Sequence, residues 1–400
     1  MATTVFALLV LSGAALYFMT GQERMRLARS AAAGAKTALR AATHSSAPSD
    51  PLDAFLAART GWPIVTPLLL AVNVAIFTGM LFGRGAIADT RTLLEWGANY
   101  APRTTSGEWW RLATSIFVHG SVLHLLATAA GLLPLGLILE RAVGRTAFAT
   151  VYLASGIVAS VVSLWTTSAT SITLGASGSL FGMYGLTVAT IVWGCIRTPR
   201  VPISLDAIKR IAAAAVLCVG YNLLTDRVDT PSELAGLCTG IAGGLIVARG
   251  VAREKPPVSR AAIVLAAAVI VAIAGAVPLR GIIDARPELA RIAAAEERTA
   301  ADYAAAVDKF KRGRLSAKAL GAMIEHTIIP TLQANRARLE ALRGVPREQA
   351  TLVAAAREYF DLREASWRSR ADGLLKGKMT LLTDAERTER AALDALQRIL

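Results

Sequence analysis

Cysteine and histidine are scarce in this sequence, which has three cysteines and four histidines among its 400 residues. Cys195, Cys218 and Cys238 fall within apolar runs, and no two of them have the spacing of metal ligands. We therefore expect small buried hydrophobic side chains at these positions, and neither a metal site nor a cofactor.

Charge is scarce as well, because only 18% of the residues are charged and 54% are hydrophobic. This composition excludes a soluble protein of such length. A helix that crosses about 30 Å of hydrocarbon needs roughly 20 mainly apolar residues. We predict eight spans, one each at about 5–20, 65–82, 123–139, 147–165, 177–196, 211–224, 234–248 and 261–279.

The net charge of +14 raises the possibility of a nucleic-acid partner, but its distribution indicates membrane topology instead. Lys and Arg collect in alternate connections, around Arg141, Arg200 and Lys255, whereas 166–173 has no basic residue. Such an excess marks the cytoplasmic side. We expect a multi-pass protein of the plasma (inner) membrane, with the turn before Glu233 and the start of the Ser177 helix at its outer face.

The chain divides by composition into four parts. No basic residue precedes the first apolar run and a basic stretch follows it, which is the reverse of a cleaved signal peptide. We predict an uncleaved anchor over 1–20, a cytoplasmic linker over 21–62 and a membrane domain over 63–280.

The part over 284–400 has 21 Lys/Arg and 17 Asp/Glu with the signs interspersed, as on solvated helix faces. We predict a soluble α-helical domain of three or four helices that binds a protein partner. Breaks are expected near Gly313, Pro330, 344–346 and Gly377.

Two glycine-rich segments stand out within the membrane domain. "LGASGSLFGMYG" (174–185) places Gly178 and Gly182 on one helical face, and "SELAGLCTGIAGG" (232–244) does the same with Gly236 and Gly240. Small residues at this spacing let helix backbones approach closely in lipid. Taken alone, the Gly-Ala-Ser-Gly segment is explained better by ordinary packing of small residues.

Glu233 lies near the direction of Gly240 on its predicted helix, at about 100° per residue. Contact between the two glycine faces would bring this carboxyl group near Ser177. An ionisable residue inside a span is costly and is by default a functional candidate. The alternative is a glutamate at the membrane surface whose side chain reaches water.

Residues 63–250 resemble the rhomboid family of intramembrane serine proteases. The resemblance rests on an ordered set of segments rather than on any single motif. These are "WPIVTPLLLAVNVAIF", "WWRLATSIFVHG", "HGSVLHLLATAAGLLPLG", "LERAVGRTAFATVYLASGI", "GASG" and "SELAGLCTG". It implies an all-α polytopic bundle of six core helices, and the span at 261–279 fits the extra helix of some members.

The resemblance also implies a serine–histidine dyad, with Ser177 of "GASG" as the nucleophile. The slot of the base histidine, before Gly236 and Gly240, holds Glu233 instead. His124 matches the oxyanion-side histidine, Gly175 would support it, and the partner asparagine is replaced by Thr128. A shorter hydroxyl donor there predicts a weakened oxyanion hole.

His119 matches another position that the family commonly fills. His119 and His124 are five residues apart, so we expect them to point about 140° apart and to share no metal.

Two functions follow from these residues. The first is an intramembrane endopeptidase that uses Ser177 and Glu233 on membrane-spanning substrates. The second is a pseudoprotease that binds or escorts transmembrane helices without hydrolysis, since a glutamate in water, with a pKa of about 4.3, is a poor base at pH 7. A transporter is disfavoured because the sequence lacks inverted repeats and interrupted helices.

Overall fold

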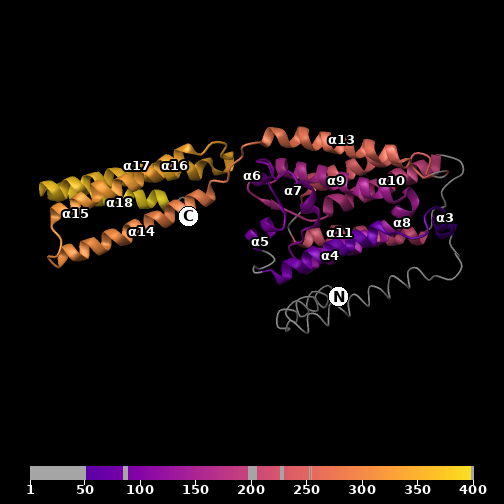
Figure 1. The fold of residues 1–400 in the computed structure, drawn as a ribbon, viewed down its shortest axis with the longest axis horizontal. Helices are drawn as coiled ribbons and strands as arrows, with labels where there is room; N and C mark the ends of the chain where they lie inside the picture. Colours follow the sequence, from indigo (N-terminus) through magenta and orange to yellow (C-terminus); the bar gives the residue numbers. More distant parts are fainter. Residues whose placement is uncertain are drawn as a thin grey trace. The chain divides into compact units, whose positions relative to one another are not determined.

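The structure, a computed structural model, describes residues 51–83, 89–196, 205–225, 229–251, 253 and 255–397, without the side chains of 53, 222–225 and 396. The predicted anchor (1–20) and the linker up to residue 50 lie outside the described residues. The rest forms two compact units, each built of helices (Figure 1). The membrane unit comprises the described residues up to Tyr100 with Trp110–Thr167 and Ile172–Ala276; the C-terminal unit comprises Ala101–Trp109, Ser168–Ser171 and the described part of Val277–Leu400.

Six helices of the described chain are long and apolar enough to cross a bilayer, which confirms the predicted all-α polytopic fold. They are α4 (Val65–Phe82), α8 (Val122–Val143), α9 (Arg145–Thr166), α10 (Ser177–Ile196), α12 (Thr230–Val247) and α13 (Val258–Ala276), which continues as the 3₁₀ turn η2 (Val277–Leu279). The remaining predicted span of this part, 211–224, lies in α11 (Leu205–Thr225), which is not one of the six. This helix begins earlier than predicted, and its first turns carry Asp206, Lys209 and Arg210.

The loop between α4 and α8 contains short elements that the sequence did not reveal. They are α5 (Thr90–Glu95), β1 (Asn99–Tyr100), α6 (Ala101–Thr104), α7 (Arg111–Thr114) and the 3₁₀ turn η1 (Ser115–Phe117). β1 pairs antiparallel with β2 (Ile172–Thr173), in the register Asn99 to Thr173. The buried Arg111 guanidinium donates to the carbonyls of Leu94 (2.7 Å) and Ala98 (3.0 Å). The loop is therefore fixed by backbone pairing and by one buried cation.

The start of α4 is held by a carboxylate from the end of α8. Glu140 is fully buried and accepts hydrogen bonds from the backbone N–H groups of Ile64 (2.6 Å), Val65 (2.8 Å) and Thr66 (2.8 Å). The Thr66 hydroxyl donates to it as well, at 2.8 Å. The first N–H groups of a helix have no partner inside the helix and favour negative charge. Glu140 therefore caps α4 from another helix, and the hydrogen bonds that it accepts offset the cost of burying its charge.

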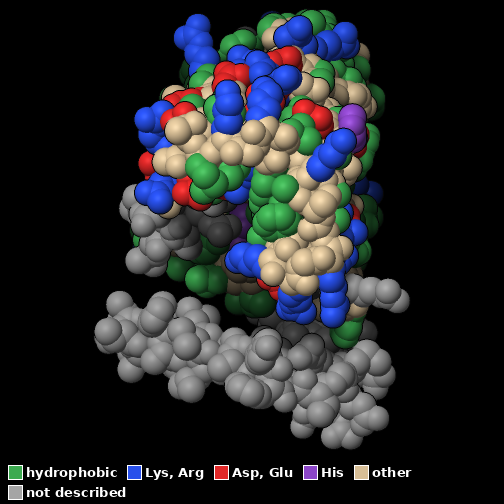
Figure 2. All heavy atoms as spheres, turned by 90° about the vertical axis from the view of Figure 1, so that its left-hand side faces the viewer, with side chains coloured by type: hydrophobic (Ala, Val, Ile, Leu, Met, Phe, Trp, Pro, Cys, Tyr) green, Lys and Arg blue, Asp and Glu red, His purple; other side chains and the backbone are tan. Residues whose placement is uncertain are grey.

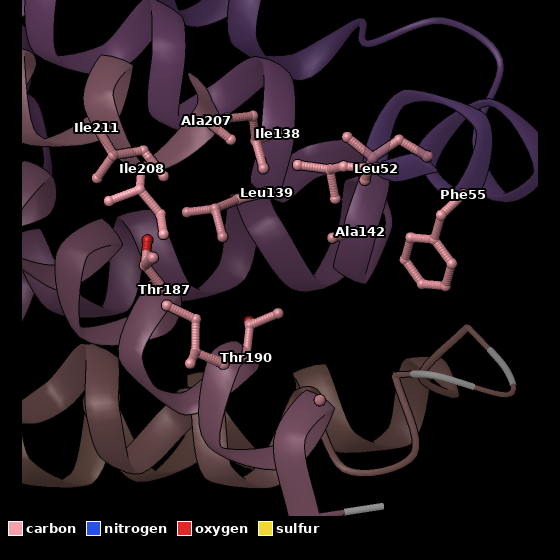
Figure 3. Close-up of a pocket in the computed structure, with 13 residues that line it drawn as sticks. Leu52, Phe55, Ile138, Leu139, Ala142, Thr187, Thr190, Ala207, Ile208 and Ile211 are labelled. Carbon is pink, nitrogen blue, oxygen red and sulfur yellow. The ribbon is translucent and has the colours of Figure 1, made fainter. Parts of the chain in front are cut away.

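A helix, α3 (Pro51–Arg59), occupies part of the segment predicted as a linker. Its Leu52 and Leu56 are buried, and Arg59 donates to the carbonyl of Ala142 at the end of α8 (3.3 Å). With α8, α10 and α11 it encloses an apolar pocket, lined on the α3 side by Leu52 and Phe55 (Figure 3). α3 thus packs as part of the membrane unit.

The C-terminal unit confirms the predicted helical region. Its helices are α14 (Arg286–Lys311), α15 (Ala317–Met323), the π-helical turn η3 (Ile324–Ile328), α16 (Ile329–Ala341), α17 (Arg347–Lys376) and α18 (Met379–Gln397). Breaks occur at 312–316, 342–346 and 377–378, near three of the predicted positions. The break expected at Pro330 was wrong, because η3 leads directly into α16 and Pro330 follows this π-helical turn, where the regular α-helical hydrogen-bond pattern is already interrupted.

Trp367 and Phe360 fill the core of this unit. Beside them the buried Arg363 forms an ion pair with Glu389 at 2.5 Å. The Tyr359 hydroxyl donates to Glu296 at 2.9 Å, and burial raises the pKa of Glu296. The unit therefore combines an aromatic core with a buried polar network.

Candidate active site

The backbones of α10 and α12 touch along their glycines. A side-chain carbon at Gly236 would overlap the carbonyl of Gly178, and one at Gly240 would overlap the carbonyl of Gly182. Both contacts have the same sequence offset, so the two helices run parallel. The opposite side of α10 packs closely on α9, where a carbon at Gly178 would overlap Ala159. Glycine is required here because no side chain fits between the helices.

This parallel contact places the first turns of α10 and α12 at the same end of the bundle. α10 begins at Ser177, directly before Gly178, and Glu233 stands three residues before Gly236 in the first turn of α12. Glu233 is buried, at 7% exposure, and Ser177 is partly exposed. The α12 turn is capped by Asp229, whose carboxylate accepts from the Ser232 N–H at 3.3 Å. A hydroxyl and a carboxyl group therefore occupy one end of the α10–α12 contact.

Within the part of the chain that the structure describes, the Ser177 hydroxyl makes no hydrogen bond, and hence none to Glu233. Proton transfer between the two would need a rotation of one side chain or a bridging group. Catalytic hydrogen bonds are often long in free enzymes and shorten when substrate binds. The arrangement is compatible with a catalytic pair, but the pair is not assembled.

His124 lies against the loop that leads into α10. A side-chain carbon at Gly175 would lie only 2.5 Å from Nε2 of His124, and Gly175 adopts a positive φ of 106°. The Gly175 N–H donates to the carbonyl of Ser115 at 2.9 Å, which fixes this loop. Glycine is therefore required at position 175 for its conformation and for the space that the imidazole takes.

Tyr221 of α11 stacks on the His124 ring, with centroids 5.4 Å apart and an interplanar angle of 17°. Sequence reasoning missed this residue. The available signal was a tyrosine near the end of an otherwise aliphatic span. Tyr221 covers one face of the imidazole and links α11 to the site.

His119 and Thr128 are joined by a buried hydrogen bond. Nε2 of His119 lies 3.0 Å from the Thr128 hydroxyl, and Nδ1 lies 3.1 Å from the carbonyl of Phe117. Since a carbonyl can only accept, Nδ1 carries the proton. Burial lowers the pKa of His119 to about 4, so the ring is neutral at pH 7 and Nε2 is a bare acceptor. The Thr128 hydroxyl therefore donates to His119 and has no second proton for another acceptor.

The expectation that His119 and His124 point apart was wrong. Their rings are in edge-to-face contact, with centroids 4.8 Å apart. The helical angle does not apply because α8 begins at Val122, so that His119 precedes the helix. In the described residues, no group of three or more His, Cys, Asp or Glu side chains is placed to hold a metal ion.

Comparison with known proteins identifies the membrane unit. Residues 106–250 match the rhomboid domain. The chain is 28% identical over 182 residues to the rhomboid protease GluP of Bacillus subtilis, covering 46% of this chain and 34% of GluP. It is 29% identical over 179 residues to the putative rhomboid protease YdcA of the same organism, covering 45% and 85%. It is also 31% identical over 185 residues to rhomboid-like protease 3 of Toxoplasma gondii, covering 44% and 65%.

The similarity thus covers less than half of this chain and only about a third of GluP. It includes α8, α9, α10 and α12, the helices that carry Ser177, His124 and Glu233. On this basis residues 106–250 of the chain, a multi-pass integral membrane protein, form a rhomboid domain.

Proposed function

We propose that this protein is an intramembrane endopeptidase that hydrolyses peptide bonds of membrane-spanning substrates in the plasma (inner) membrane. Ser177 is the nucleophile and Glu233 is the proton acceptor. The observation that supports the proposal is the backbone contact between α10 and α12, since Ser177 and Glu233 lie in the first turns of these parallel helices, at the same end of the bundle.

In the proposed reaction the Ser177 oxygen attacks the scissile carbonyl, and the hydroxyl proton passes to the Glu233 carboxylate. The proton then goes to the leaving amine as the peptide bond breaks, and water releases the acyl group from Ser177. The oxyanion that forms when Ser177 attacks would be stabilised by His124 and by the backbone N–H of Ser177. This N–H lies in the first turn of α10, where a helix N–H has no partner inside the helix.

Thr128 contributes no donor in this scheme, because its proton is held by His119. Loss of one oxyanion donor typically lowers the rate about 10²–10³-fold. We therefore expect slow turnover compared with a member that has both the histidine base and the asparagine donor.

One observation favours a second function, in which the protein binds transmembrane helices without cleaving them. The Ser177 hydroxyl makes no hydrogen bond among the described residues, so no resting contact activates it. A serine without a paired base is a weak nucleophile. In this case the glycine-lined scaffold would retain helix recognition and lose hydrolysis.

Labelling with a fluorophosphonate distinguishes the two functions. The purified protein in detergent is treated from pH 5 to pH 9 beside Ser177→Ala, Glu233→Gln and Glu233→His. Ser179→Ala is the matched control, since Ser179 is a buried hydroxyl on the same helix. Labelling of the parent that disappears in Ser177→Ala and falls in Glu233→Gln supports the endopeptidase.

An unlabelled parent, with labelling that appears in Glu233→His, would contradict hydrolysis and support helix binding. Equal labelling of the parent and Ser177→Ala would contradict Ser177 as the nucleophile. Thermal unfolding of each variant shows whether it remains folded, so that loss of labelling can be assigned to chemistry.

A further inference from the structure

One end of the C-terminal unit gathers cationic side chains. At this end α14 leads into α15 and α17 leads into α18 (Figure 1). Here α15 is in contact with the end of α17, because a side-chain carbon at Gly321 of α15 would lie 2.9 Å from Cγ of Leu375. The opposite end of the unit is held by a hydrogen bond from the Ile283 N–H to the Gly344 carbonyl at 3.1 Å. The 26 residues of α14 separate the two ends by about 39 Å.

Seven exposed basic residues lie at this end, and we call them the basic end. Within 308–318 and 372–379 the only carboxylates are Asp308 and Asp372. Each is paired inside the set, Asp308 with Arg312 at 3.0 Å and Asp372 with Lys376 at 2.9 Å. The positive charge is therefore largely uncompensated. The seven residues are Lys309, Lys311, Arg312, Arg314, Lys318, Lys376 and Lys378.

Large apolar side chains are exposed among these cations. Met379 is 72% exposed, and Phe310 and Leu375 are each 38% exposed. Figure 2 faces this end and shows Lys and Arg side chains beside hydrophobic ones. Exposed apolar residues interleaved with Lys and Arg are typical of surfaces that bind the headgroup region of an anionic bilayer.

We propose that the basic end binds the surface of a bilayer that contains anionic phospholipids. Only residues 280–285 separate the end of η2 from the start of α14, and the basic end lies about 39 Å from this connection, so the bilayer that it binds is one that the far end of the unit reaches. A bilayer fits the apolar side chains, which a purely electrostatic partner would leave in water. Each Lys or Arg near an anionic surface strengthens binding about fivefold. Recognition by an acidic protein or by RNA is an alternative that the test separates.

The test uses the full chain in nanodiscs of neutral phosphatidylcholine. These are mixed with separate vesicles of phosphatidylcholine, with or without phosphatidylglycerol, and binding is measured by flotation. The protein is expected to float with the anionic vesicles at low salt, to be released at high salt and to ignore the neutral vesicles.

Lys311→Glu/Arg314→Glu is expected to weaken flotation at least twentyfold, about fivefold for each lost cation. The matched control, Arg338→Glu/Arg343→Glu, makes the same charge change on two exposed residues near the opposite end and should bind as the parent does. Phe310→Ser/Met379→Ser keeps the charge and should weaken vesicle binding severalfold.

Three results would overturn the proposal. The first is equal flotation with neutral and anionic vesicles, and the second is an equal loss in the control variant. The third is binding to RNA or to an acidic peptide without binding to the anionic vesicles. Because the substituted residues are exposed, circular dichroism should confirm that each variant keeps its helix content.

Discussion

The Nε2 atom of His119 lies 3.0 Å from the hydroxyl oxygen of Thr128, and the direction of the hydrogen bond is fixed by the carbonyl that Nδ1 faces. The threonine is the donor. The sequence resemblance implies an asparagine at this position in rhomboid proteases, and an asparagine amide would have a second N–H to offer. If that resemblance holds at this position, threonine supplies one donor fewer than asparagine would, although both residue types are polar.

Replacing Thr128 with valine should destabilise the membrane unit by about 1–3 kcal/mol, because Nε2 of the buried His119 loses its donor. The measurement is thermal unfolding of the full chain in detergent. Thr128→Ser, which keeps the hydroxyl, should recover most of the loss. An unchanged midpoint in Thr128→Val would show that this hydrogen bond contributes nothing to stability.

Acidification should destabilise the protein through His119. Its pKa is about 4 in the folded state, below the value of about 6.5 for a solvated histidine. Between these values the unfolded state binds more protons, so this contribution is complete above pH 6.5 and is lost as the pH falls towards 4. The difference amounts to on the order of 3 kcal/mol.

The check is the unfolding temperature of the parent and of His119→Gln between pH 4 and pH 8. Glutamine keeps a side-chain acceptor for the Thr128 hydroxyl and does not titrate. The parent should lose more stability on acidification than the variant, and parallel curves would contradict this role of His119.

Gly240→Ala should destabilise the bundle by about 1–3 kcal/mol, because the added carbon meets the Gly182 carbonyl and forces the backbones apart. Gly220→Ala is the control, since a carbon there meets nothing within 4 Å. The control should be neutral or slightly stabilising, as alanine favours helix. Comparable losses in both variants would mean that the α10–α12 contact is not specific.

Glu140→Gln should loosen the start of α4, because an amide places N–H donors against the N–H groups of residues 64–66. We expect a loss on the order of 3 kcal/mol. The measurement is hydrogen exchange of these amides, which should become faster. Glu95→Gln, at an exposed ion pair with Arg91, should leave their exchange unchanged.

The apolar runs and the glycine spacing were sufficient to predict most of the membrane helices and their closest contact. The span predicted at 65–82 coincides with α4, because its apolar run has the length that a membrane-spanning helix needs. Gly236 and Gly240 both face α10, as their spacing of four residues predicts from the 3.6-residue repeat of a helix.

What the sequence did not reveal depends on contacts between distant residues. The bonds of Glu140 to residues 64–66 join positions more than 70 residues apart, and no local pattern specifies them. The Tyr221 stack on His124 is another case. The assignment of Thr128 as the hydrogen-bond donor also depends on the Phe117 carbonyl that faces Nδ1 of His119. The position of this carbonyl is defined by the folded loop.

The direct contact between the glycines of α10 and α12 limits how the two helices can move. Helices joined backbone to backbone cannot rotate about their own axes without steric overlap, so they should behave as a single rigid body. Any change in the distance between the Ser177 hydroxyl oxygen and the Glu233 carboxyl group must then come from the torsions of these two side chains. Such rotamer changes are fast on the scale of helix displacements. The separation of these two side chains is consequently set by local rotamers within a fixed backbone frame.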